Sequence, residues 1–133
     1  MVIDSSALLA IVLGESDAGV FIDALGRAFE RHTPLYIPAS VIVEAGIIAD
    51  QRSQGDQLDS LMDRIGAEIA PLNERVAELA RKAFEKFGRG RHRASLNFGD
   101  CMSYATPKYL QLPLLYEGDD FKRTDVEPAL ART

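Results

Sequence analysis

The sequence predicts an α/β fold in which a central parallel β-sheet carries α-helices on both faces. Short apolar segments bounded by turn residues alternate with longer segments of helical periodicity through most of the chain. This alternation is typical of strand–helix–strand units, whose strands run parallel. With 133 residues, 47 % of them hydrophobic, the chain is long enough for one core and too short for two, so we expect a single domain at residues 1–133.

The ends of these segments carry residues that begin and stop helices. Asp4 or Ser5 can cap the first helix, and Gly88 ends the fifth. The sequence PLYIP places the second strand between two prolines. Pro107 lacks a backbone donor, so we expect the helix that contains it to be shorter or bent. In chain order, the expected strands are residues 1–4, 34–38, 67–72 and 112–121, and the expected helices are residues 5–14, 16–31, 39–52, 57–66, 73–88 and 98–110.

The counts of particular residues narrow the class of protein. The single cysteine, Cys101, cannot form an internal disulfide, and two histidines, His32 and His92, do not supply the Cys and His spacing of a zinc site. The sequence has no uninterrupted apolar run of about 18 residues and no signal-peptide pattern. We therefore expect a cytoplasmic protein with no membrane segment.

Charge is distributed unevenly along the chain. The net charge of −5 argues against a protein that binds nucleic acid through its bulk charge. Residues 81–93 nevertheless contain six Lys and Arg and one Glu, a net charge of +5, so the remainder carries −10. This basic segment predicts either a contact with nucleic acid or a solvated helix face with its loop.

Acidic residues occupy four positions of interest for a binding site. Asp4 follows the first strand, and Asp119 and Asp120 follow the last one, and ligands of parallel sheets bind at such carboxyl ends of strands. Glu44 lies within the apolar sequence VIVEAGII, where an unpaired charge is costly, and Asp100 lies in the first turn of the last helix. Helix capping, turn formation and pairing of Glu44 with an arginine are the alternative roles.

If these carboxylates lie close together, a bound cation is needed to neutralise their charges. Their mutual repulsion raises their pKa values unless a positive charge neutralises them. Oxygen ligands without neighbouring His or Cys suit Mg²⁺ or Mn²⁺ rather than zinc. An ion of this kind commonly serves phosphoryl chemistry, in which it activates water and offsets charge on the phosphate.

Four stretches of the sequence together resemble a known family. They are MVIDSSAL, PASVIVEAGII, FGRGRHRASLNFGDCMSYA and LPLLYEGDDFKRTDV. In this order and spacing, which spans nearly the whole chain, they resemble PIN-domain ribonucleases, specifically the VapC toxins of type II toxin–antitoxin pairs. The resemblance implies a PIN-like fold and an endoribonuclease that depends on Mg²⁺ or Mn²⁺.

The resemblance gives the acidic residues a common role. Asp4, Glu44 and Asp100 match the three main acids of the family's metal site. Asp120 matches the fourth, because the family keeps an acid directly before the phenylalanine, and Asp119 is the reserve. The expected catalytic residues are Asp4, Glu44, Asp100 and Asp120, and the expected metal ligands are Asp4, Asp100 and Asp120.

Other residues are expected to support this site. Ser6 and Asn97 are expected to hydrogen-bond to the metal ligands, although helix capping is the more common role for both residue types. The basic loop is expected to hold the RNA backbone close to the acids, offsetting their repulsion of phosphate. Its expected RNA-binding residues are Arg89, Arg91, His92 and Arg93.

The resemblance also implies protein partners. A VapB-like antitoxin would lay its C-terminal segment across the toxin, and homodimers are usual in the family. The amphipathic segments 16–31 and 57–65 are candidate surfaces for these contacts. The alternative function is that of a catalytically silent PIN-like domain that binds a partner protein, with its acids acting as caps and turn residues.

Three side chains near Asp100 are expected to be structural. Phe98 and Tyr104 lie at helical spacing, so we expect both in the core rather than stacked on bases. Cys101 has no recognisable histidine partner, so we expect a small buried residue rather than a nucleophile.

Overall fold

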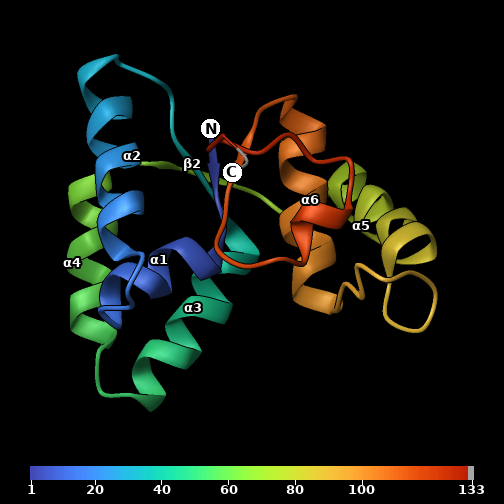
Figure 1. The fold of residues 1–133 in the computed structure, drawn as a ribbon, viewed down its shortest axis with the longest axis horizontal. Coiled ribbons are helices and arrows are strands. Elements are labelled where there is room, and N and C mark those ends of the chain that lie inside the picture. Colours follow the sequence, from blue (N-terminus) through green and yellow to red (C-terminus); the bar gives the residue numbers. More distant parts are fainter. Residues whose placement is uncertain (132–133) are drawn as a thin grey trace.

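The structure is a computed structural model that describes residues 1–131. Its helices and strands alternate along the chain as the sequence predicts (Figure 1). The strands are β1 (Val2–Ile3), β2 (Tyr36–Pro38), β3 (Glu68–Ala70) and β4 (Leu114–Leu115). The helices are α1 (Ser5–Val12), α2 (Ala18–Glu30), α3 (Ala39–Gln51), α4 (Gly55–Ile65), α5 (Glu74–Phe87) and α6 (Phe98–Leu110), followed by the 3₁₀ helix η1 (Phe121–Arg123).

The four strands form one parallel sheet in the order β3-β2-β1-β4. Alternate residues of the central strands face opposite layers, as the pleat of a strand requires. Val2 and Leu114 pack with residues of α5 and α6, whereas Ile3 and Leu115 pack with residues of α1 to α4. Figure 1 shows these two helical layers on either side of the strands, which confirms the predicted architecture.

The strand order reverses between β1 and β4. The chain proceeds from β1 outward through β2 to β3 and then returns to place β4 on the other side of β1. The backbone N–H of Asp4 donates to the carbonyl of Leu115 at 2.9 Å, so the carboxyl ends of the two strands are joined. Ligands of open parallel sheets bind at such a reversal, and Asp4 begins the segment that leaves it.

Two local predictions need correction. Pro107 does not shorten α6, which continues to Leu110; the proline is buried in the last turn, and its carbonyl accepts from the N–H groups of Gln111 and Leu112. Helix α3 is less enclosed than its apolar sequence predicts, because Val43 is 61 % exposed and Ile47 is 53 % exposed. The neighbouring helices cover only the face of α3 that carries its buried alanines and Val41.

Across residues 1–131, no helix combines the length and the apolar character that crossing a bilayer requires.

Candidate active site

Asp4 begins the site at the junction of β1 and α1. The residue is 4 % exposed and serves as the N-cap of α1, where its Oδ2 accepts from the backbone N–H of Ser6 at 3.1 Å. The hydroxyl of Ser6 donates to the same carboxylate oxygen at 2.6 Å. The Asp4 carboxylate therefore caps α1 and also lies at the carboxyl end of β1. The hydrogen bond from Ser6 to this acid, which the sequence predicts, is present.

Ser6 also connects this junction to the segment after β4. Its hydroxyl oxygen accepts from the backbone N–H of Glu117 at 2.9 Å, across 111 residues of sequence. A single hydroxyl thus positions the Asp4 carboxylate relative to the turn that carries Asp119 and Asp120.

Glu44 reaches the site from the second turn of α3. The hydroxyl of Ser5 donates to its Oε1, and no arginine partner for it is found among the described residues. Its other oxygen, Oε2, lies over the backbone of Gly99, where a Cβ atom would overlap it. The carboxylate is therefore held between the start of α1 and the start of α6, and the alternative of pairing with an arginine is not found among the described residues.

Asp100 lies at the start of α6 in a reciprocal capping arrangement. Its backbone N–H donates to Asn97 Oδ1 at 2.9 Å, and its Oδ2 accepts from the backbone N–H of Asn97 at 3.0 Å. Two otherwise unpaired amides at the helix start are satisfied in this way. The predicted contact between Asn97 and Asp100 is present, and it is a capping contact.

The electrostatics of Asp100 show that the four acids share one region. Burial raises the pKa of Asp100 to about 6, against the lowering effect of the hydrogen bond from Asn97. The charges of Asp4, Asp120 and Glu44 raise this pKa further. Asp4 follows β1, Asp120 directly precedes η1 and Glu44 lies in α3, so the fold gathers carboxylates that are far apart in sequence.

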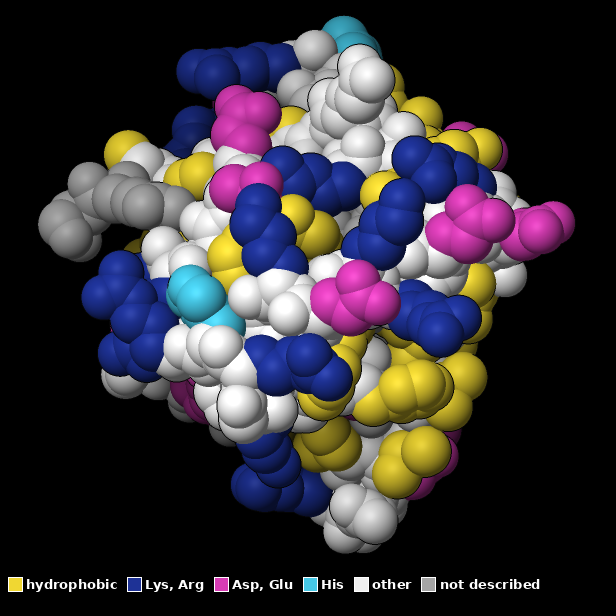
Figure 2. Space-filling view, turned by 90° about the vertical axis from the view of Figure 1, so that its right-hand side faces the viewer, with side chains coloured by type: hydrophobic (Ala, Val, Ile, Leu, Met, Phe, Trp, Pro, Cys, Tyr) yellow, Lys and Arg dark blue, Asp and Glu magenta, His cyan; other side chains and the backbone are white. Residues whose placement is uncertain are grey.

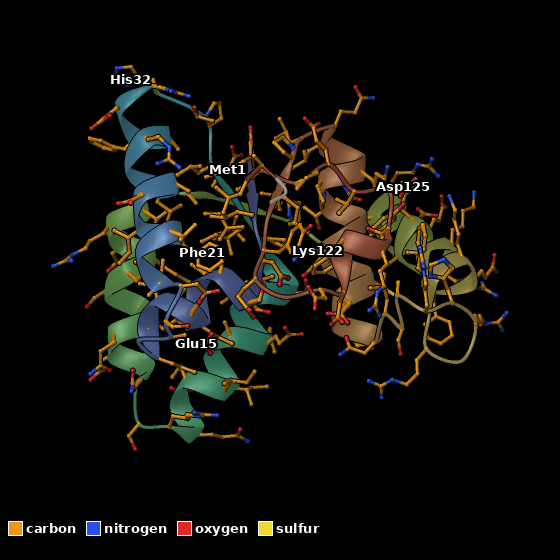
Figure 3. All side chains as sticks on the ribbon, in the orientation of Figure 1. Met1, Glu15, Phe21, His32, Lys122 and Asp125 are labelled. Atoms are coloured by element: carbon orange, nitrogen blue, oxygen red, sulfur yellow. The ribbon has the colours of Figure 1, made fainter. Side chains whose placement is uncertain are left out.

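Asp119 and Asp120 differ in their surroundings. Asp119 is exposed and pairs with Lys122 at 3.0 Å, which holds the pKa of its carboxyl below its usual value. Figure 3 shows Lys122 near the middle of the molecule and His32 at the far end of α2. The charge of Asp120, not that of Asp119, is among those that act on Asp100. These contacts favour Asp120 as the fourth acid.

The acidic residues of the described chain suit a metal ion by their chemistry rather than by a coordination shell that is already formed. Within residues 1–131, no three His, Cys, Asp or Glu side chains are already arranged to hold one. The donor set nevertheless suits a hard divalent cation, because it consists of carboxylates whose unneutralised charges raise the pKa of Asp100. Ser6, Ser5 and Asn97 each hold one acid through a hydrogen bond. The chemistry of the residues fits Mg²⁺ or Mn²⁺.

The basic loop joins α5 to α6 and ends directly before Asn97. Backbone hydrogen bonds between Arg89 and Leu96, and between Leu96 and Phe87, close its base. Arg89, Arg91 and Arg93 are exposed. Figure 2 shows Lys and Arg side chains gathered on this side of the molecule. The loop therefore presents positive charge beside the start of the helix that carries Asp100.

His92 differs from its arginine neighbours. It is half-buried, its ring packs edge-on against Phe87 at 5.1 Å between centroids, and its Nδ1 accepts from the backbone N–H of Ala94 at 3.0 Å. These contacts stabilise the loop. They leave only the other ring nitrogen to contact RNA.

Sequence reasoning missed Ser5 and Gly99. Both contact the Glu44 carboxylate, which comes from another helix. The sequence around Ser5 and Gly99 therefore does not indicate this contact, except that each residue directly precedes or follows a predicted acid.

The prediction for Cys101 agrees with the structure, in which burial and the charge of Asp100 raise the pKa of the thiol to about 11. Tyr104 is buried as predicted, whereas Phe98 is 82 % exposed and its predicted core position is wrong.

Comparison with known proteins shows the family of the chain. The PIN domain family matches residues 1–127. VapC ribonuclease Mb0625 of Mycobacterium bovis is 43 % identical over 138 residues, which cover 99 % of each chain. The chain belongs to the VapC family of PIN-domain ribonucleases. Ribonuclease VapC30 of Mycobacterium tuberculosis is another relative of this VapC chain, 38 % identical over 128 residues that cover 95 % of each chain.

A solved structure supports the PIN fold independently of sequence. The crystal structure of Mycobacterium tuberculosis VapC20, described as a sarcin-ricin loop cleaving toxin, superposes with a TM-score of 0.71. The match covers 94 % of this VapC chain and 95 % of VapC20 at 14 % sequence identity. The shared feature is therefore the fold.

Replacement of Asn97 by alanine tests its capping role. We expect Asn97→Ala to lower the free energy of unfolding by about 1 kcal/mol, because the amide of Asp100 loses its acceptor. Asn73 is a matched control, since it caps α5 by accepting from Val76 N–H at 2.9 Å. Urea unfolding should give similar losses for Asn97→Ala and Asn73→Ala. A much larger loss for Asn97→Ala would show that its role exceeds capping.

Proposed function

We propose that this protein is an endoribonuclease toxin that hydrolyses RNA phosphodiester bonds with Mg²⁺ or Mn²⁺ as its cofactor. The observation that carries the proposal is that the fold brings the acids together at the strand reversal, where Ser6 joins Asp4 to the segment after β4 and Glu44 lies over Gly99 beside Asp100, in a chain of the VapC family. Asp4, Asp100 and Asp120 would hold the ion, directly or through water, and Glu44 would complete the acidic set.

The residues of the chain would orient and balance the reacting groups. Ser6 and Ser5 hold the carboxylates of Asp4 and Glu44, and the capping bond of Asn97 holds Asp100. A bound Mg²⁺ or Mn²⁺ supplies activation of water and offsets the charge that develops on the phosphate. One carboxylate accepts the proton of the attacking water.

The basic loop would bind the RNA backbone. Arg89, Arg91 and Arg93 are exposed next to α6, whereas the rest of the chain is strongly acidic. RNA affinity should therefore depend on this local charge and fall steeply with salt concentration.

The family also supports two protein partners. We propose a VapB-like antitoxin that covers the acidic site, and a homodimer formed through apolar helix surfaces in the cytoplasm. Ile22 is 52 % exposed and Phe29 is 76 % exposed on α2, one of the two helices nominated from sequence for such contacts. The other is α4, which carries Leu61 and Ile65 beside them.

Cleavage of RNA by the antitoxin-free protein tests the proposal. A mixed cellular RNA pool would be incubated with Mg²⁺, Mn²⁺ or EDTA, and fragments would be detected by sequencing their ends. We expect metal-dependent cleavage by the wild type and none by Asp4→Asn, which keeps a capping side chain at the start of α1.

The adjacent acids provide a matched pair in this assay. Asp120→Asn should lose cleavage, whereas Asp119→Asn, which only breaks the surface pair with Lys122, should retain it. If the folded wild type cleaves no RNA and calorimetry shows no metal binding, the nuclease proposal fails and the protein-binding alternative replaces it.

A further inference from the structure

Phe98 is placed unusually for a large aromatic residue. Its side chain is 82 % exposed, the highest value among the large hydrophobic residues of the described chain. It is the first residue of α6, and Asp100 lies two positions further on. Exposure of such a ring loses the free energy that its burial would provide. The exposed ring is therefore a candidate binding surface for a ligand that covers it.

Phe98 forms one wall of a hollow of about 570 Å³ between α5 and α6. The hollow is lined mainly by apolar groups, with arginines among them. The lining includes Leu72, Phe84, Met102, Arg81 and Arg91. Figure 2 shows hydrophobic side chains exposed beside Lys and Arg on this side of the molecule. An apolar floor with cationic groups suits a ligand that is flat and apolar in one part and anionic in another.

The arginines of the hollow fit the anionic part of a nucleotide. The Arg91 guanidinium carbon lies 5.9 Å from the centroid of the Phe84 ring, so this arginine stands over an aromatic face with its donors free for an anion. Glu85 is the one acidic residue in the lining. It lies within the segment 81–93, whose net charge is +5. Charge complementarity therefore favours an anionic ligand such as RNA over a basic or uncharged apolar one.

The hollow also adjoins the acidic site. Phe98 immediately precedes Gly99, over which the Glu44 carboxylate lies. Asp100 lies in the first turn of the same helix, and Cys101 contributes to the wall of the hollow. A nucleotide held here would therefore place a neighbouring phosphate of the same strand near the carboxylates.

We propose that Phe98 stacks on a base of single-stranded RNA next to the bond that is cleaved, with Arg81 and Arg91 contacting the adjoining phosphates. This inference rests on the proposed ribonuclease function and assigns a substrate-binding surface to it. Base–aromatic stacking tolerates any base, so the contact positions the strand without selecting a particular sequence.

Binding measured without cleavage tests the inference. A short fluorescein-labelled single-stranded RNA would be titrated with protein in EDTA, and its anisotropy would give the Kd. We expect Phe98→Ala to weaken binding about 10-fold or more. Tyr109→Ala is the matched control, because Tyr109 is an exposed aromatic residue near the other end of α6. It should bind the RNA as the wild type does.

A tryptophan variant adds a direct readout of stacking. The chain has no tryptophan, so Phe98→Trp introduces a single fluorophore. We expect this variant to keep wild-type affinity and to lose fluorescence when RNA binds. An RNA of the same length without bases should bind wild type and Phe98→Ala equally, since only phosphate contacts remain.

The outcomes separate this inference from the proposed function. Equal RNA affinities for Phe98→Ala and Tyr109→Ala would overturn the stacking contact, and the exposed ring would then be assigned to a protein partner. Absence of metal-dependent cleavage by the wild type would instead overturn the ribonuclease function, while the binding difference between the variants would still report the RNA surface.

Discussion

Asp100→Asn should produce a protein that is more stable than the wild type at neutral pH without metal and that has lost about 100-fold or more of its ribonuclease activity. The pKa of Asp100 is about 6 in the folded chain, raised by burial and by the charges of Asp4, Asp120 and Glu44. In the unfolded chain it is about 4. Asparagine keeps an acceptor for the Asn97 amide but carries no charge.

The sign of the pH dependence follows from these pKa values. Between pH 4 and 6 the folded state binds more protons at Asp100 than the unfolded state does. The stability that Asp100 contributes is therefore present below about pH 4 and is lost as the pH rises through about 6. After discounting for the partial exposure of Asp100, we expect Asp100→Asn to be about 1 kcal/mol more stable than the wild type at pH 7.5.

Urea unfolding in EDTA at several pH values measures the difference in stability between Asp100→Asn and the wild type, which should vanish near pH 4.

Asp125→Asn is the control, because its effect on stability should have the opposite sign. Partial burial alone would raise the pKa of Asp125, but the hydrogen bond from Tyr104 and the charge of Lys108 outweigh it and lower that pKa. Asp125→Asn should therefore destabilise the protein at neutral pH. Destabilisation by Asp100→Asn as well would mean that the carboxylate favours folding despite its neighbours.

Gly99→Ala should reduce ribonuclease activity by about 10-fold to 100-fold without loss of stability. A Cβ atom at position 99 would overlap Glu44 Oε2, so the carboxylate must move away from the start of α6. The end of a glutamate side chain can move at small cost. Alanine is also the better helix former, by about 0.5–1 kcal/mol in a helix interior.

Gly46→Ala is the matched control for this substitution. Gly46 lies on the same helix as Glu44, and a Cβ atom there would have no neighbour within 4 Å among the atoms of the described chain. Initial cleavage rates and thermal unfolding should show full activity for Gly46→Ala and reduced activity for Gly99→Ala at equal or higher stability. Equal activities would show that catalysis does not depend on the position of Glu44 over Gly99.

Most of the secondary structure could be predicted because its signals are local. Asn73 and Asn97 cap their helices, and Gly66 ends α4 in the left-handed conformation that glycine adopts easily. The effect of Pro107 could not be predicted in the same way. Its consequence depends on its place in the last turn and on burial against the core, and both are properties of the folded helix.

The exposure of side chains was harder to predict than the elements that carry them. Helical spacing cannot tell which of two apolar faces another helix will cover. Phe98 and Tyr104 both follow the apolar pattern of α6, but Tyr104 faces α5 and the core while Phe98 stands at the helix start. Val43 and Ile47 are exposed for the same reason on α3.

The sequence by itself determined the parallel α/β architecture and the capped helix starts, because alternation and capping are properties of short segments. Only the tertiary structure decided which groups meet. The crossing of α3 over the starts of α1 and α6 places Glu44 between Ser5 and Gly99. The return of the chain to β4 brings Asp120 close enough for its charge to act on Asp100. Such contacts join residues far apart in sequence, so no local pattern specifies them.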